Sequence, residues 1–193
     1  MDLKFFFSGI KNILFNPVKA WITIDSDNKS VKFVKNNYLI PFLILNSVAA
    51  FVGSLIFINT QLSAVYSIFA GVKMFILMYF TVYASSFILG EITFPLDLGR
   101  NFSVSFRIIV YSLTPFLICQ ILSGIFESLL FVNVIGLYSL YIFWTGAEKF
   151  LNPPQYKKMS LLIAAMFCMA GIYILSGIVL NTLIDKIFYA FFS

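Results

Sequence analysis

Histidine is missing from this sequence, and charged residues are scarce. The 193 residues include no histidine, two cysteines, and only 11% Asp, Glu, Lys and Arg together. Imidazole-based metal sites, proton shuttles and histidine-activated nucleophiles are therefore excluded. The cysteines, Cys119 and Cys168, both fall inside apolar runs, where we expect small packing residues rather than a disulfide. We expect no metal or other cofactor.

Apolar residues dominate what is present. They make up 61% of the chain, whereas an ordinary soluble domain is about half apolar. Water cannot solvate this much apolar surface, so the expected solvent is lipid. The net charge of +5 does not indicate a nucleic-acid partner, because the basic residues lie in short connectors between apolar runs rather than on a folded basic surface.

The long apolar runs predict an all-α polytopic membrane protein. A spanning helix needs about 20 mostly apolar residues. Five runs meet this requirement, at residues 38–58, 68–89, 104–126, 129–147 and 159–180. The predicted organisation is an N-terminal segment (1–37), a five-span transmembrane domain (38–180) and a C-terminal tail (181–193). The tail is too short for a sixth span, and we expect it to lie along the outer surface.

The uneven distribution of lysine and arginine predicts the orientation. With five crossings, the N-terminal segment shares one side with the loops near 90–107 and 148–158. That side holds eleven of the thirteen basic residues; the other has only Lys186 and Lys73, whose amine we expect to reach the outer interface. Short cytoplasmic loops carry the positive excess. We therefore predict a cytoplasmic N-terminus and an external C-terminus.

Residues 3–16 predict an amphipathic helix ahead of the first span. One apolar arc contains Leu3, Phe6, Phe7, Ile10, Ile13 and Leu14. The segment is too short to cross a bilayer. It either lies in the cytoplasmic interface, with its lysines toward anionic headgroups, or packs on the protein's own spans. Trp21, a few residues later, is a candidate interfacial anchor.

A proline interrupts the third predicted span, in the stretch "YSLTP" at residues 111–115. Proline has no N–H, so the carbonyl of Tyr111 loses its helical partner, and neighbouring hydroxyls are candidates to replace it. Tyrosines of the fourth span share one face at a similar depth. We predict a polar seam between spans three and four, which either shapes the bundle or forms a headgroup or small-solute site. The seam residues are Tyr111, Ser112, Thr114, Pro115, Tyr138 and Tyr141.

Three stretches carry a family likeness: "FNPVKAWITI" (15–24), "FRIIVYSLTPFLI" (106–118) and "GLYSLYIFWTGAEKFLNPPQYKK" (136–158). They resemble the Yip family of integral membrane proteins, named for interaction with Ypt/Rab GTPases. The resemblance implies five spans and a cytoplasmic N-terminus. Eukaryotic relatives serve vesicle traffic and contact prenylated small GTPases. This chain has only about 37 residues before its first span, which argues against a small-GTPase partner. Its Phe, Ile, Lys and Asn bias is typical of a bacterial member, in the cytoplasmic (inner) membrane, with no settled activity.

Three classes of function stay open. The first is a non-catalytic scaffold or partner-binding protein that contacts lipids, other membrane proteins or further copies of itself. The alternative is a lipid-handling or small-solute transport protein that uses the kinked third span. The third class, an intramembrane enzyme, would depend on Glu91, Asp97 and Arg100, which are more simply residues of a solvated connector. We therefore expect no enzyme.

Overall fold

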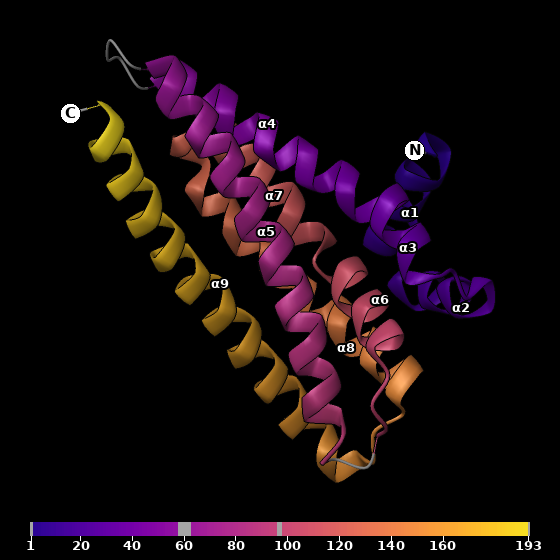
Figure 1. The fold of residues 1–193 in the computed structure, drawn as a ribbon. Coiled ribbons are helices and arrows are strands. Elements are labelled where there is room, and N and C mark those ends of the chain that lie inside the picture. Colours follow the sequence, from indigo (N-terminus) through magenta and orange to yellow (C-terminus); the bar gives the residue numbers. More distant parts are fainter. Residues whose placement is uncertain (1, 58–62, 96–97, 193) are drawn as a thin grey trace.

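The computed structural model describes residues 2–57, 63–95 and 98–192, and the elements it forms there are helices (Figure 1). In chain order they are α1 (Leu3–Phe15), α2 (Pro17–Asp27), α3 (Val31–Val34), η1 (Lys35–Leu39), α4 (Ile40–Phe57), α5 (Ser63–Thr93), α6 (Phe102–Ser112), α7 (Thr114–Ile125), η2 (Glu127–Leu137), α8 (Tyr138–Leu151) and α9 (Gln155–Phe192). The η1 segment is a π-helix and η2 is a 3-10 helix.

The predicted all-α polytopic architecture is confirmed. Four continuous helical stretches are long and apolar enough to cross a membrane, and the bent pair α6–α7 makes a fifth candidate when it is counted as one broken span. The continuous stretches are Val31–Phe57, Ala64–Thr93, Ser128–Leu151 and Gln155–Ile184. The sequence located all five spans, although the helices extend beyond the predicted limits at most ends.

The spans alternate in direction, so the bundle has two distinct ends. The final residues of α4, the first turns of α5 and the last turns of α9 gather at one end (Figure 1). There Lys73 of α5 donates a 3.0 Å hydrogen bond from its ammonium to the side-chain carbonyl of Asn181 in α9. The turn from α8 to α9 lies at the other end, where Lys149 forms a 3.4 Å ion pair with Asp25 of α2. We call this second end, which α2 covers, the N-terminal end.

The last helix corrects the prediction for the C-terminal tail. Residues 181–192 do not fold back along the surface but continue α9, which runs for 38 residues from Gln155 to Phe192. The physical reason is that neither glycine nor proline occurs after Gly177, so no residue ends the helix where the fifth span leaves the apolar layer.

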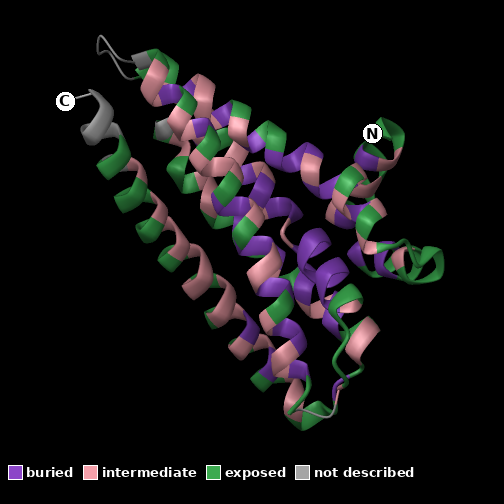
Figure 2. Ribbon diagram, viewed as in Figure 1, coloured by how far each residue is buried: buried purple, intermediate pink, exposed green. Residues whose placement is uncertain are grey.

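Burial is concentrated toward the N-terminal end. Purple, buried segments cover most of α6 and the beginning of α4, whereas α9 is mostly intermediate or exposed (Figure 2). The largest fully buried side chains include Trp21, Tyr38, Phe6, Phe42, Phe106 and Phe143. Since lipid solvates apolar side chains as well as a protein core does, the exposed apolar surface of α9 is compatible with a span that faces the bilayer.

The N-terminal helix α1 packs on the protein's own spans. Asp2 caps it by accepting a 3.0 Å hydrogen bond from the Phe5 amide. Phe6 is buried, with its ring centroid 4.9 Å from that of Phe42 in α4. Phe7 and Phe15 remain exposed on the other side of the helix. The inward side of α1 therefore packs on the protein's own spans. Contact of its outward side with lipid stays a prediction.

Trp21 is not an interfacial anchor, because its side chain is fully buried between α2 and α8. The indole N–H donates to the carbonyl of Ile142 and to the hydroxyl of Thr145, both at 3.1 Å. Gly146 makes room for the ring: a Cβ atom there would come within 2.6 Å of it. A buried tryptophan with a paired N–H is a packing residue, which explains how α2 is attached to the fourth span.

Candidate functional site

The third span is broken at Leu113, where α6 and α7 meet at an angle of 45°. Pro115 cannot supply the N–H that the carbonyl of Tyr111 needs. The hydroxyl of Thr114 replaces it with a 2.8 Å hydrogen bond to that carbonyl. Because the Thr114 proton is used there, the Tyr38 hydroxyl, 2.8 Å away, donates to the Thr114 oxygen.

Tyr38 is the residue of the kink that sequence reasoning missed. It belongs to η1, its side chain is fully buried, and its ring lies 4.6 Å from that of Tyr111. Single-turn π segments occur inside longer helices, often at functional sites, but they leave no hydrophobic pattern by which a sequence reveals them. The only feature of Tyr38 visible in the sequence is its position at the start of the first predicted span.

Tyr138 and Tyr141 do not join the predicted seam. Their rings stack on each other, with centroids 5.5 Å apart, and Tyr141 is 49% exposed. The Tyr138 hydroxyl donates to the carbonyl of Leu14, so this face of α8 turns toward α1. Spans three and four instead meet through Ser139, whose hydroxyl accepts a 3.2 Å hydrogen bond from the Phe116 amide that the kink leaves free.

Beside the kink lies a cavity of about 410 Å³, which we call the kink cavity. It is open on one side and is lined by α5, the α6–α7 break, η2, α8 and α9. Apolar walls come from residues such as Phe116, Phe143, Met166 and Met169. The polar groups around it are those of Thr81, Ser85, Ser112, Asn133, Ser139 and Tyr173, and none of the lining residues is charged.

Three hydroxyls at this cavity are buried and unsatisfied. Thr81, Ser85 and Ser112 are 4%, 2% and 1% exposed, and their oxygen atoms have no hydrogen-bond partner within the described ranges. Helical serines usually donate to the carbonyl four residues back, as the neighbouring Ser86 does to Val82 at 2.6 Å. An unpaired buried hydroxyl costs about 1–3 kcal/mol. These three hydroxyls, and the side-chain oxygen of Asn133, which is also unpaired within the described residues, belong to residues that line the same cavity.

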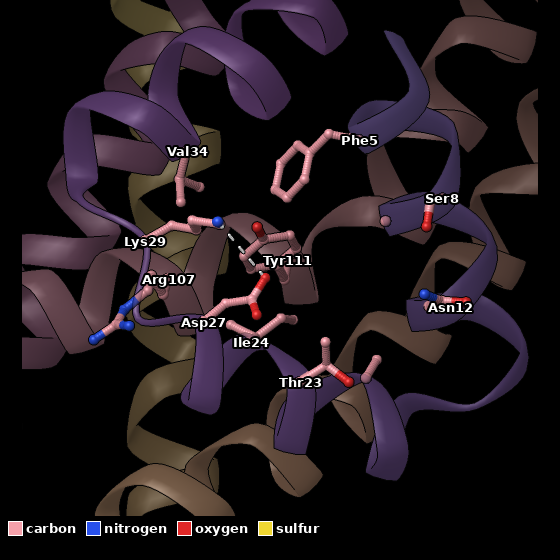
Figure 3. A pocket seen from close by; sticks show the side chains of 12 residues that line it. Phe5, Ser8, Asn12, Thr23, Ile24, Asp27, Lys29, Val34, Arg107 and Tyr111 are labelled. Carbon is pink, nitrogen blue, oxygen red and sulfur yellow. Dashed lines mark ion pairs between the residues drawn. The ribbon is translucent and has the colours of Figure 1, made fainter. Parts of the chain in front are cut away.

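A second, smaller cavity of about 120 Å³ lies at the N-terminal end (Figure 3). We call it the rim pocket. The Lys29 ammonium and the Asp27 carboxylate face each other at 3.9 Å on its wall. Tyr111 of α6 lines the rim pocket, and the next residue, Ser112, lines the kink cavity. The two cavities therefore adjoin consecutive residues of the third span. The remaining lining comes from α1, α2, α3 and Arg107 of α6.

Of the three residues offered as catalytic candidates, the structure describes two, and these two pair with each other. Glu91 and Arg100 are partly exposed and form an ion pair with each other at the end of α5. Asp97 lies outside the described residues. In the part of the chain that is described, no three His, Cys, Asp or Glu side chains come close enough to hold a metal ion.

Comparison with known proteins identifies one family. A family model described as Yip1 domain matches residues 11–178, which is most of the chain. Curated proteins and solved structures yield no match.

Proposed function

Because this chain belongs to the Yip1 domain family of membrane proteins, we propose that it is a non-catalytic binding protein whose kink cavity holds a membrane lipid. The observation that carries the proposal is the set of three unpaired hydroxyls, Thr81, Ser85 and Ser112, at one 410 Å³ cavity. We propose hydrogen-bond acceptors of a bound ligand as the partners of these hydroxyls.

The walls define the chemistry of that ligand. They are predominantly apolar and carry hydroxyl and amide groups but no charge, so the bound portion is uncharged. Ligand sites of this kind use a few placed polar groups to orient an otherwise apolar molecule. The ester carbonyls of a glycerolipid, between its acyl chains and its headgroup, have this character. A transported ion does not, because ions need charged or carbonyl-rich partners inside a membrane.

The loose attachment of α9 supports access from the bilayer. This helix packs on the bundle mainly through α5 and has only a small contact with α8. Between α7 and α9, the Gln120 side-chain amide donates to the Tyr173 hydroxyl at 3.1 Å, beside the cavity. An acyl chain would enter between α8 and α9 without crossing a polar barrier.

Filling the cavity should expel the lipid. In Ser85→Leu a larger apolar side chain occupies the space and removes one hydroxyl. We expect the affinity for the lipid held in the kink cavity to fall about tenfold in mild detergent, equivalent to roughly 1.4 kcal/mol of binding free energy. Native mass spectrometry of the full chain would measure it. Ser160→Leu, on an exposed position of α9, is the matched control and should retain lipid normally.

A scaffold function is the second candidate, supported by the exposed apolar face of α9. Phe167 and Leu175 are among its most exposed side chains. The same mass spectra separate the two candidates. Lipid that stays bound to the wild type and is lost from Ser85→Leu supports the cavity function. Repeated recovery of a protein partner, with no lipid in either variant, would contradict it and favour the scaffold.

We also propose that the N-terminal end of the bundle faces the cytoplasm, in the inner membrane of a bacterium. Support comes from the collection of eleven of the thirteen basic residues on that side of a five-span chain. A fluorescent protein fused to the N-terminus should fold and fluoresce, while alkaline phosphatase fused to the C-terminus should be active outside. Finding both labels in one compartment would contradict five crossings.

A further inference from the structure

The rim pocket, separate from the kink cavity, lies where the bundle meets the membrane edge. The first candidate span begins at Val31, two residues after Lys29, and the third begins at Phe102, little more than one helical turn before Arg107. Lipid phosphates and the groups attached to them occupy this depth, at the boundary of the apolar layer. The pocket is therefore at headgroup level rather than among the acyl chains.

Opposite charges stand on one wall of this pocket. The Lys29 ammonium and Asp27 carboxylate point into it from the turn after α2 (Figure 3). At 3.9 Å they form only a loose ion pair, and both side chains are nearly half exposed. Such a pair contributes little to stability, so each partner can exchange the other for a ligand at low cost.

The Tyr111 hydroxyl provides a third group. Its side chain is only 3% exposed and lines the pocket, and within the described residues the structure gives its oxygen no hydrogen-bond partner. In Figure 3 it points toward the space between Lys29 and Asp27. A phenol O–H readily donates a hydrogen bond, so Tyr111 offers the pocket a donor for an acceptor bound there.

Arg107 fixes the turn that carries the two charges. Its guanidinium donates at 2.7 Å to the Asn28 side chain, between Asp27 and Lys29, and at 3.3 Å to the Ser103 carbonyl. Asn28 has the left-handed φ of +40° that ends α2 and turns the chain here. The side chain of Arg107 points away from the pocket centre, so it positions the turn and adds positive charge without filling the space.

We propose that the rim pocket binds a phosphate–ammonium headgroup, phosphoethanolamine, carried by a bilayer lipid. The phosphate accepts from Lys29 and from the Tyr111 hydroxyl, while the primary ammonium donates to Asp27. A zwitterion satisfies both charges of the pocket, whereas an anionic headgroup leaves Asp27 unpaired. A choline headgroup has no N–H to donate to the carboxylate.

The test measures lipid selectivity of the full chain in mild detergent, using phosphatidylethanolamine, phosphatidylglycerol and phosphatidylcholine with identical acyl chains. The wild type should prefer phosphatidylethanolamine. Asp27→Asn should weaken that lipid about fivefold and leave phosphatidylglycerol unchanged or improved, while Lys29→Gln should weaken both about fivefold, the scale of a partly exposed charge pair. Native mass spectrometry at several lipid concentrations gives the affinities.

Matched controls lie on the same elements. Asp25→Asn removes a carboxylate two residues from Asp27 that pairs with Lys149 instead, and Lys32→Gln removes an exposed ammonium outside the pocket. Neither should alter selectivity. Equal affinity of the wild type for the three lipids, or equal effects of Asp25→Asn and Asp27→Asn, would overturn the proposal.

Two further measurements identify the source of the headgroup and the pocket that binds it. Free glycerophosphoethanolamine should fail to displace the lipid at concentrations near the lipid's own dissociation constant; displacement there would overturn the bilayer as the source. Ser85→Leu should leave headgroup selectivity intact, because its cavity lies on the other side of the kink. A failure of the rim-pocket proposal is thereby distinguishable from a failure of the kink-cavity function.

Discussion

Gly53→Ala is expected to destabilise the bundle by about 3 kcal/mol or more, because it forces overpacking between two spans. A Cβ atom at this position of α4 would lie 1.9 Å from the carbonyl oxygen of Gly124 in α7. The obstacle is backbone, so no side chain can move aside and the two helices must separate. Thermal or denaturant unfolding in detergent, followed by circular dichroism, would measure the loss.

Two other glycines, where an added Cβ has more room, serve as comparisons for Gly53→Ala. At Gly171 on α9 an added Cβ meets nothing within 4 Å, so alanine there should be neutral or stabilise by roughly 0.5–1 kcal/mol through helix propensity. At Gly124 the nearest atoms, from Ala49 and Ala50, lie at ordinary contact distances of 3.5 Å. A Gly53→Ala protein as stable as the Gly171→Ala protein would show that α4 and α7 do not pack closely.

Trp21→Ala should detach α2 from the fourth span at a cost of about 3–5 kcal/mol, the usual range for a buried aromatic side chain. The substitution removes a fully buried ring and both hydrogen bonds from its indole N–H. Since α2 carries Asp27 into the rim pocket, selectivity for phosphatidylethanolamine should fall with it. Hydrogen exchange of α2, compared with that of α5, would report local detachment separately from global unfolding.

The second tryptophan of the chain supplies the control. Trp144 on α8 is only partly buried and faces the α9 side, so Trp144→Ala should leave exchange in α2 unchanged. Trp21→Phe should lie between alanine and the wild type, because it keeps most of the ring area but loses the N–H. Protection of α2 that is the same in all three variants would contradict the role given to Trp21.

The spans, and much of the kink, were predictable because they follow from local chemistry. An apolar run long enough for a bilayer has few alternatives to a helix, and Pro115 removes a backbone donor in any fold. The small residues Ala49 and Gly53 permit close helix approach by composition alone, although the sequence does not identify Gly124 as their partner.

Tyr138 and Tyr141 lie outside the contact between spans three and four for a geometric reason. Tyr138 and Tyr141 share a helix face, as their spacing requires, but spacing cannot tell which neighbour that face meets. In lipid the rotation of an apolar helix is decided by packing rather than by burial from water. Here the buried ring of Trp21 against Gly146 fixes the rotation of α8, so its tyrosines turn toward α1.

By itself the sequence determined the class of molecule, the positions of its long apolar helices and the position of the break, since each depends only on residues close together in the chain. Tertiary structure alone decided which side chains meet at that break. The Tyr38 hydroxyl bonds to Thr114, and the Ser139 hydroxyl accepts from the Phe116 amide. The unpaired hydroxyls of Thr81, Ser85 and Ser112 come together around one cavity. These groups come from separate spans. Their meeting depends on how helices rotate and cross, which hydrophobic patterning does not encode when lipid and protein interior are equally apolar.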